Sequence, residues 1–477
     1  MNNRQANPQL LSRRDLFQQI SAGVGSAALM SLFNEDVFGA GDTLPSVPNH
    51  KPRARSVIHL FMNGGPSQMD LLDPKPELDR HHGEDYFERI AGEVEFPDAA
   101  GSLMRSPFKF AQHGECGMWV SELMPHLATQ VDKIAQIRSL QTTNLTHEPA
   151  LYKIHSGSEF TGRPSLGAWV SYGLGTENRN LPAYVVLDDP LGLPVNGVDN
   201  WQAGYLPPTH QGTRFRATGS PVLNLKPEFS EPDAVRQVER ELIARLDHIH
   251  RRDRPARPRL DARIASYELA ARMQLAASDA LDLNQETTET QRRYGIDQPV
   301  TESYGRRCLI ARRLVERGVR FVQLFINSQI WDNHSNIGTA LKGACDRTDK
   351  PIAALLDDLD QRGLLGDTLV AWGGEMGRLP IAQLSGDKDP RKAGRDHNRN
   401  VINTWFAGGG IAGGVVHGAT DDLGFSAVEN KVSVPDWHAT VLHLLGLHHD
   451  DLFIERNGLK ERLTGVSPAR VISEIFA

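Results

Sequence analysis

Six short apolar runs, separated by longer amphipathic stretches, constrain the fold of this chain more than any other feature. The runs cover residues 56–62, 133–140, 183–188, 319–327, 368–373 and 402–408. Apolar residues recur at helical spacing over residues 234–250, 259–280, 302–317, 347–362 and 436–446. Short buried strands that alternate with helices are typical of a mainly parallel sheet whose faces are covered by helices. We therefore predict an α/β fold with a mainly parallel central sheet flanked by helices.

The length and composition are those of a large globular domain. The chain has 477 residues, of which 39% are hydrophobic and 23% are charged, so it contains enough apolar material for a large core. Residues 63–130 and 189–230 are rich in Pro and Gly, and we expect them to form long loops over one edge of the sheet. We predict one domain over residues 55–477, with a helical insert at 225–300.

Charge and cysteine content exclude some classes of partner and site. The formal net charge is −7, and the densest basic stretch is short, at residues 251–259. We therefore expect no nucleic-acid partner, although this basic stretch could face an anionic polymer. Cys116, Cys308 and Cys345 are odd in number and have no C-x-x-C spacing. They indicate neither a disulfide framework nor a zinc site built from cysteines.

The N-terminal segment resembles an export signal. Residues 12–17, SRRDLF, precede a small and apolar stretch and resemble a twin-arginine signal. The alternative is a chance arginine pair before a buried helix. The segment is too short and glycine-rich for a stable membrane span. We expect a signal peptide at 1–40 and a Pro-rich linker at 41–54. The twin-arginine machinery would carry the folded protein, with any bound cofactor, to the periplasm or the cell exterior.

Polar side chains gather where the predicted strands end. In open parallel sheets, ligands bind outside the carboxyl ends of the strands. The residues found there are Asn63, Ser67 and Asp70, then Thr146 and His147, then Asp332 and His334, then Glu375, and finally Arg395, Asp396 and His397 just before the last strand. Each group alone is weak support, because surface Asp and His are common. Their joint occurrence after successive strands predicts a metal site at this edge.

The stretch AWGGEMGR, at residues 371–378, places a carboxylate among glycines directly after a strand. Glu375 is either a loop residue without a chemical role or a functional side chain. The flanking glycines allow the backbone to turn tightly at the strand end, which would direct this side chain into a shared site. We interpret Glu375 as a metal ligand.

The order of these motifs resembles the uncharacterised, exported, sulfatase-like branch of the alkaline phosphatase superfamily. The resemblance covers nearly the whole chain and rests on several segments: HLFMNGGPSQMDLLDPKP, TGRPSLGAWVSYGLG, NWQAGYLPPTHQGTRFR, ARIASYELAARMQ, WDNHSN, WGGEMGR, GRDHN and PDWHATVLHLLGL. It implies a three-layer, alkaline-phosphatase-like sandwich. It also implies hydrolysis of sulfate or phosphate esters with one or two divalent metals, of which Zn, Ca and Mg remain open.

The resemblance also suggests which residues hold the metal. Asn63 occupies the ligand position after the first strand, with Asp70 as an alternative. Glu375 stands where relatives usually have aspartate. The remaining implied ligands are Asp332 with His334, and His397 with its neighbour Asp396.

The catalytic nucleophile is harder to infer from the resemblance, because the sulfatase motif C/S-x-P-S-R does not occur in the sequence. Cys116 has the wrong neighbours. Phosphodiesterase-like relatives use a threonine before a helix, and THEPALYKIHSG at 146–157 resembles that layout with one extra residue. Thr146 is therefore the candidate nucleophile, and His147 is a candidate ligand or acid. The alternative is that the Thr146 hydroxyl caps the helix beginning near Glu148.

Two arginines are candidates for binding the ester's anion. Arg378, three residues after Glu375, could clamp a sulfate or phosphate oxygen bidentately, and Arg163 in TGRPS could do the same. Either could instead pair with an acidic residue.

Three functions remain in competition. The first is an exported, metal-dependent hydrolase of sulfate or phosphate esters, acting on a small molecule or a polysaccharide. The second is a non-catalytic envelope protein that keeps the fold and binds a ligand. The missing sulfatase motif favours the second, whereas the retained acids and imidazoles favour the first. A phosphoglycerate-mutase-like transferase is disfavoured by export.

Overall fold

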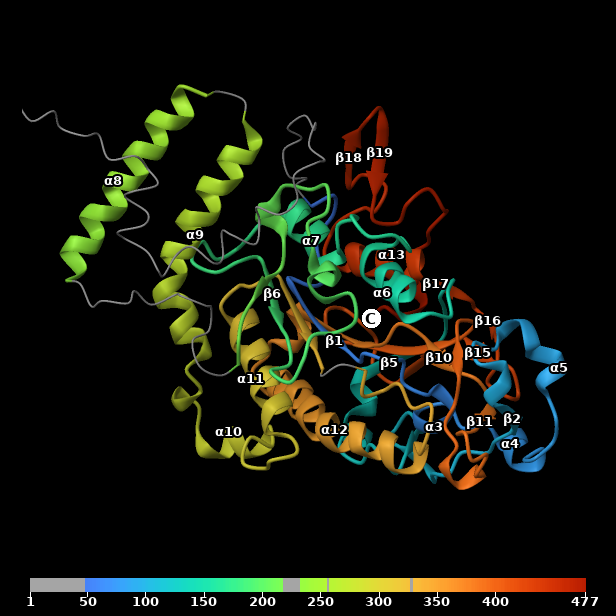
Figure 1. The fold of residues 1–477 in the computed structure, drawn as a ribbon. Coiled ribbons are helices and arrows are strands. Elements are labelled where there is room, and N and C mark those ends of the chain that lie inside the picture. The colour runs from blue at the N-terminus through green and yellow to red at the C-terminus, as the bar shows by residue number, and fades with distance from the viewer. Residues whose placement is uncertain (1–47, 218–231, 255–256, 327–328) are drawn as a thin grey trace, which may run out of the picture.

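A nine-stranded sheet forms the centre of the molecule. The computed structural model describes residues 48–217, 232–254, 257–326 and 329–477 (Figure 1). The strand order is β14-β5-β13-β9-β1-β8-β6-β7, and β17 also pairs with β5. These strands are β1 (Ser56–Phe61), β5 (Ile134–Gln141), β6 (Tyr184–Leu187), β7 (Thr213–Arg214), β8 (Phe321–Phe325), β9 (Thr368–Gly373), β13 (Ile402–Ala407), β14 (Val415–His417) and β17 (Val432–Ser433). Each predicted strand is present, with ends within two residues of the expected positions.

One strand of this mainly parallel sheet runs in the opposite direction. β1 is parallel to β8 and β9, whereas β13 is antiparallel to its neighbours β5 and β9. Residues that precede β13 therefore lie at the same edge as residues that follow β1, β5, β8 and β9. This reversal explains why the segment at 395–398 can join the strand-end residues.

Helices cover both faces of the sheet, as predicted. Along β1, Val57 and Phe61 belong to one buried core, and Ile58 and Leu60 belong to the other, because successive side chains point to opposite faces. The first core includes residues from α6 (His147–Ser156), α7 (Leu166–Leu174) and α13 (Val434–Leu444). The second includes residues from α9 (Pro258–Leu281), α11 (Glu302–Glu316) and α12 (Ile337–Gln361). The molecule is therefore an α/β sandwich of three layers (Figure 1).

The region predicted as a helical insert, residues 225–300, contains three helices. They are α8 (Asp233–Arg252), α9 and the short α10 (Thr288–Arg293). Met273, Ala277 and Ala280 anchor α9 in the core, whereas Val238 and Leu242 of α8 are exposed. Figure 1 shows α8 on the outer side of α9, away from the sheet.

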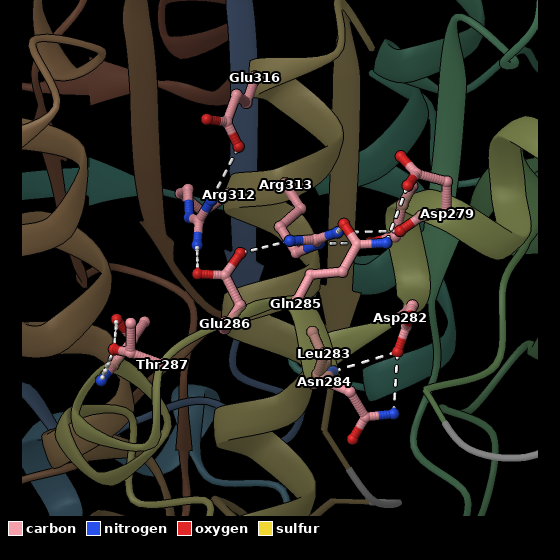
Figure 2. A network of polar contacts seen from close by, with 12 residues as sticks. Asp279, Asp282, Leu283, Asn284, Gln285, Glu286, Thr287, Arg312, Arg313 and Glu316 are labelled. Carbon is pink, nitrogen blue, oxygen red and sulfur yellow. Dashed lines mark hydrogen bonds and ion pairs between the residues drawn. The ribbon is translucent and has the colours of Figure 1, made fainter.

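A buried network of arginines and carboxylates joins α11 to the elements around it (Figure 2). Arg312 of α11 lies 2.7 Å from Glu286, 2.7 Å from Glu316 and 3.0 Å from Asp358 of α12. Arg313 also contacts Glu286 and donates to the carbonyl of Ala280 at the end of α9. The network therefore ties α9, α11 and α12 together.

The predicted loop region at 63–130 carries several short elements. They are α3 (Gln68–Leu71), α4 (Pro76–Arg80), α5 (Phe87–Ile90), β2 (Ala100–Leu103), β3 (Phe110–His113) and β4 (Met118–Ser121). β2 pairs with β11 (Ile381–Gln383), and a small apolar core that includes Leu78, Ile90 and Leu103 supports this layer. Elements of four or five residues are too short for periodicity to reveal.

The N-terminal part of the described chain packs on the sandwich. The backbone N–H groups of Asn49 and Arg53 donate to the carbonyls of Gly446 and Leu444, each over 2.8 Å, although the linker was expected to reach residue 54. The expected signal peptide at 1–40 lies outside the described residues. Within the described part of the chain, no helix combines the length and apolar character needed to cross a membrane.

Candidate metal centre

Four side chains converge at the carboxyl edge of the sheet. They are His147, Asp332, His334 and His397, and one donor atom from each lies within 4.8 Å of the others. His147 opens α6 directly after β5, and Asp332 and His334 follow β8. His397 belongs to the short strand β12 (His397–Asn398), which leads into β13. The structure thus brings together residues that are far apart in the sequence, all of them predicted site residues.

Asp332 lies at the centre of this cluster. One carboxylate oxygen lies 2.8 Å from His334 Nε2 and 3.1 Å from His397 Nε2, and the other lies 3.3 Å from His147 Nε2. Burial alone would raise the pKa of Asp332. The charge of Arg378 and the hydrogen bonds to the three histidines outweigh burial and hold this pKa far below its usual range. Asp332 is therefore an anion at any physiological pH.

His147 is held between two carboxylates. Its Nδ1 lies 2.7 Å from Glu375 Oε1, opposite the contact of Nε2 with Asp332. Burial lowers the pKa of His147, but the contacts with Asp332 and Glu375 outweigh it and raise this pKa to about 9. Among the described residues, the buried Glu375 Oε2 has no hydrogen-bond partner, and the buried His147 Nε2 has no partner besides the 3.3 Å contact with Asp332. Since buried polar atoms are normally satisfied, a cation bound by His147 Nε2 fits the geometry.

Glu375 stands behind His147 and not among the four convergent donors. It is fully buried, and its Oε1 also accepts a hydrogen bond of 2.8 Å from the Gly64 N–H. Of the glycines around it, Gly373, Gly374 and Gly377 have no positive φ. A Cβ on Gly374 would instead lie 2.7 Å from the Met62 carbonyl oxygen. These glycines serve close packing of the strand ends.

Three other predicted ligands lie outside the cluster of four. Asn63 donates from Nδ2 to the Ile326 carbonyl over 2.7 Å. Asp70 is fully buried and pairs with Arg395 over 2.6 Å. Asp396 forms a second group of possible ligand atoms with Glu95 and His397. Direct ligation by Asn63, Asp70, Asp396 or Glu375 remains a prediction.

Both candidate anion-binding arginines are paired in the structure. The Arg378 guanidinium lies 2.6 Å from Asp332 and also donates to the carbonyls of Gly65, over 2.9 Å, and Arg395, over 3.1 Å. Arg378 therefore fixes Asp332 and the loop after β1. Arg163 pairs with Glu461 on β19 (Leu459–Arg462). Of the two alternatives, the structure shows pairing with an acid for each arginine.

Thr146 is the residue before α6, but its hydroxyl does not cap the helix. The residue is exposed and has the extended backbone of an N-cap, with φ −91° and ψ 141°, yet no side-chain cap hydrogen bond forms. Its backbone N–H donates to Asn144 Oδ1 over 3.0 Å. The exposed threonine therefore directly precedes a member of the metal cluster.

Sequence analysis missed two residues that touch the histidines. Glu95 contacts His397 Nδ1, and Gln383 contacts His334 Nδ1. Burial raises the pKa of Glu95, but its hydrogen bond to His397 and the nearby imidazoles give a net lowering. Glu95 lies in the segment without periodicity, and Gln383 is a neutral residue in a short strand. Neither carries a sequence signal that would have singled it out.

The arginine network borders an open pocket of about 550 Å³, and none of the residues that line it belongs to the metal cluster. The arginines of this pocket include Arg312, Arg313 and Arg317, which pair with Glu286, Glu316 and Asp279. Because carboxylates already balance these guanidiniums, the arrangement is that of a structural network.

Comparison with known proteins identifies the family. Residues 54–476 match the family described as "Protein of unknown function (DUF1501)". The chain belongs to this family. This membership agrees with the uncharacterised family that the motif order indicated. A search of curated proteins finds no match.

Several solved structures are similar to this member of the family. The lipoteichoic acid synthase LtaP from Listeria monocytogenes has 10% identity and a TM-score of 0.36, over 88% of this chain and 78% of that one. The PsFucS1 sulfatase from Pseudoalteromonas sp. has 12% identity and a TM-score of 0.36, over 84% and 68%. The alkaline phosphatase from the Antarctic bacterium TAB5 has 12% identity and a TM-score of 0.31, over 83% and 99%.

Proposed function

We propose that this protein is a divalent-metal-dependent hydrolase of phosphate or sulfate esters. The observation that carries the proposal is the convergence of His147, Asp332, His334 and His397 at the carboxyl edge of the sheet. Nitrogen and carboxylate donors at this spacing suit a divalent ion. The motif order adds the reaction class, since it resembles the sulfatase-like branch of the alkaline phosphatase superfamily.

Different residues of the chain would have different roles in the reaction. A bound divalent metal would polarise the ester oxygens and stabilise their negative charge. Thr146, exposed beside His147 at the start of α6, is the proposed nucleophile. The N-terminus of a helix also favours an anion, because its first N–H groups are unpaired within the helix. Arg378 holds Asp332 in place.

The substrate is a sulfated or phosphorylated small molecule or polysaccharide outside the cytoplasm. This part of the proposal rests on the resemblance of residues 12–17 to a twin-arginine signal. Export through the twin-arginine route delivers a folded protein to the periplasm or the exterior, where such polymers are accessible. Fusing residues 1–54 to a reporter that folds before export tests this. Replacing Arg13 and Arg14 by lysine should retain the reporter in the cytoplasm, and unchanged export contradicts the route.

The hydrolase proposal is tested on the purified mature chain. Bound metal is quantified by mass spectrometry, and the chain is assayed with aryl sulfates, phosphate monoesters and phosphodiesters. We expect about one divalent ion per chain and hydrolysis of at least one ester class. His397→Ala should lose metal and activity together. Absence of bound metal in the wild-type chain, with His397→Ala unchanged in every assay, contradicts the proposal.

A non-catalytic binding protein is the second candidate, and two observations favour it. The four clustered side chains are enough to fill a tetrahedral ion, whereas a catalytic site keeps one position open. In addition, both candidate anion-binding arginines are engaged by carboxylates. A metal-loaded chain that hydrolyses none of the three ester classes, yet binds sulfated or phosphorylated polysaccharide, supports this alternative.

A further inference from the structure

The three clustered histidines share one pattern of contacts. Each directs Nε2 toward Asp332 and places Nδ1 against an oxygen of a different residue. The three pairs are His147 with Glu375, His334 with Gln383, and His397 with Glu95. The three partners come from separate segments of the chain, so each imidazole is held from a different direction.

The pattern indicates which ring nitrogen would bind a cation. Each Nε2 faces Asp332 at the point where the rings converge, so a bound cation would replace any proton on Nε2, while the oxygen at Nδ1 accepts the remaining N–H of the ring. Metal-binding histidines commonly donate their second N–H to a carboxylate or carbonyl in this manner. In this protein the acceptors are two carboxylates and one amide oxygen. The three Nε2 atoms therefore face the same point.

The acceptors are themselves held by the fold. Glu375 is fully buried and accepts from the Gly64 N–H. Gln383 is buried in β11, where its backbone exchanges hydrogen bonds of 2.8 and 3.0 Å with Gly394. The segment carrying Glu95 is tied to the site by the next residue, because the Phe96 N–H donates to Asp396 over 2.9 Å.

We infer that Glu375, Gln383 and Glu95 are positioning residues, which orient the three imidazoles so that the site selects a zinc-class ion over Mg²⁺ or Ca²⁺. This inference rests on the metal site of the proposed function. Imidazole nitrogen suits Zn²⁺, Co²⁺ and similar ions, whereas Mg²⁺ and Ca²⁺ prefer sites made of oxygen donors. Glu375 then acts through His147 and not as a ligand.

Metal affinity and the spectrum of bound Co²⁺ test this inference without an activity assay. The full chain is stripped with a chelator, and Zn²⁺ affinity is measured by competition, with Mg²⁺ and Ca²⁺ measured by calorimetry. We expect Zn²⁺ to bind at least about 100-fold more tightly than either. We expect Glu95→Met and Gln383→Met, which each remove the oxygen acceptor at Nδ1, to weaken Zn²⁺ binding by about 10- to 100-fold. Because the ligands are intact, both variants should keep the visible Co²⁺ bands of the wild type.

Matched variants separate positioning from structural damage. Gln383→Glu keeps an oxygen acceptor for His334 and should retain most of the Zn²⁺ affinity that Gln383→Met loses. Glu95 is only partly buried, so its variants should fold, as circular dichroism would show, even if a Glu375 variant does not. His397→Ala removes a ligand and should alter the Co²⁺ spectrum itself.

Failure of this inference and failure of the proposed function give different results. If the wild-type chain binds none of Zn²⁺, Co²⁺, Mg²⁺ and Ca²⁺, the metal site and the proposed function both fail. If the wild type binds Zn²⁺ but Glu95→Met and Gln383→Met bind it equally well, the positioning roles fail while the proposed function stands. Tighter binding of Mg²⁺ or Ca²⁺ than of Zn²⁺ overturns the selectivity.

Discussion

At the scale of single residues, substitutions of Thr146 distinguish a structural role in helix capping from a chemical role as the nucleophile. Its position before α6 suits a helix cap, yet its hydroxyl makes no cap hydrogen bond. We expect Thr146→Val to change the free energy of unfolding by no more than about 0.5 kcal/mol, because an exposed, unbonded hydroxyl contributes little. The same change should abolish ester hydrolysis if Thr146 is the nucleophile, and Thr146→Ser should restore part of it.

Ser433 provides the matched control for a true cap. Its hydroxyl accepts from the Asp436 N–H over 3.2 Å, and Asp436 accepts in return from the Ser433 N–H over 2.8 Å. Ser433→Ala should lower the free energy of unfolding by about 1 kcal/mol. Chemical denaturation of both variants checks the difference. Full turnover by Thr146→Val would remove Thr146 from the mechanism.

The backbone conformation and close packing of Gly64 can also be tested by substitution. Its φ is +109°, and a Cβ would lie 2.5 Å from the backbone nitrogen of Asp332. Gly64→Ala should therefore combine backbone strain with displacement of the loop that carries Asp332, at a cost of about 2–4 kcal/mol. It should also weaken metal binding. We propose thermal unfolding and Zn²⁺ competition as the measurements.

Gly83 is the control for strain alone. Its φ is +91°, but a Cβ would meet no atom within 4 Å. Gly83→Ala should cost about 1 kcal/mol and leave metal affinity unchanged. Equal effects of both substitutions on metal affinity would show that the contact between Gly64 and the Asp332 backbone does not matter.

At the scale of elements, the arginine network determines how α11 is held (Figure 2). Arg312 is 1% exposed and faces Glu286, Glu316 and Asp358. Removing it takes away the buried charge that Glu286 and Asp358 share and leaves them only Arg313 and the more exposed Arg362, so Arg312→Met should destabilise the protein by about 3 kcal/mol. Urea denaturation measures this loss, as a lower midpoint of unfolding with an unchanged m-value.

The exposed pair on α10 is the matched control. Arg292 lies 2.7 Å from Glu289, and both side chains are more than half exposed. Arg292→Met should therefore change stability by less than about 1 kcal/mol. A similar loss for Arg292→Met and Arg312→Met would contradict the importance of burial in the network.

Sequence patterns located the long elements well and the short ones poorly. α12 begins at Ile337, ten residues before the start that its apolar spacing predicts at 347, because Gly338 and Gly343 interrupt the pattern. Leu341 and Cys345 nevertheless bury this first part in the core. Tertiary burial thus extends a helix that local propensity would end.

Within the candidate site, chemistry could be predicted more readily than geometry. His147, Asp332, His334 and His397 are the residue types that bind metal, and they follow predicted strands, so their convergence was foreseeable. The acceptors at Nδ1 were not, because Glu95 reaches the site only through the folding of a segment without periodicity. Glu375 was predicted to be a metal ligand at a strand end, which remains a prediction, and its contact with His147 Nδ1 is visible only in the structure.

At the scale of the whole molecule, three buried histidines lie between the sheet and one helical layer. They are His59 on β1, His155 on α6 and His438 on α13. The His155 ring is tilted against that of Phe61, with ring centroids 4.4 Å apart, and His438 Nε2 lies 2.8 Å from the Ile154 carbonyl. Because α6 also carries His147, the packing of these histidines helps to place the metal cluster.

Burial should make this packing sensitive to acid. It lowers the pKa of His59 to about 3, with a contribution from His438, and that of His438 to about 4, where Lys153 also contributes. The pKa of His155 is also lowered, first by burial and then by His59 and His438. In the unfolded chain these groups titrate near 6.5. Between pH 6.5 and 4 the unfolded state therefore binds more protons, so stability is complete above pH 6.5 and falls as the pH falls.

We expect the free energy of unfolding to decrease by about 2–3 kcal/mol for each of His59 and His438 between pH 6.5 and 4.5, and His155 should act in the same direction. His438→Gln retains a donor for the Ile154 carbonyl but removes one proton-binding group. The free energy of unfolding of this variant should therefore fall less steeply with falling pH, by the contribution of one histidine. His248→Gln, on the exposed face of α8, should leave the slope unchanged. Urea unfolding of the three proteins across this pH range measures the slopes. Equal slopes for His438→Gln and the wild type would show that burial does not keep His438 neutral in the folded state.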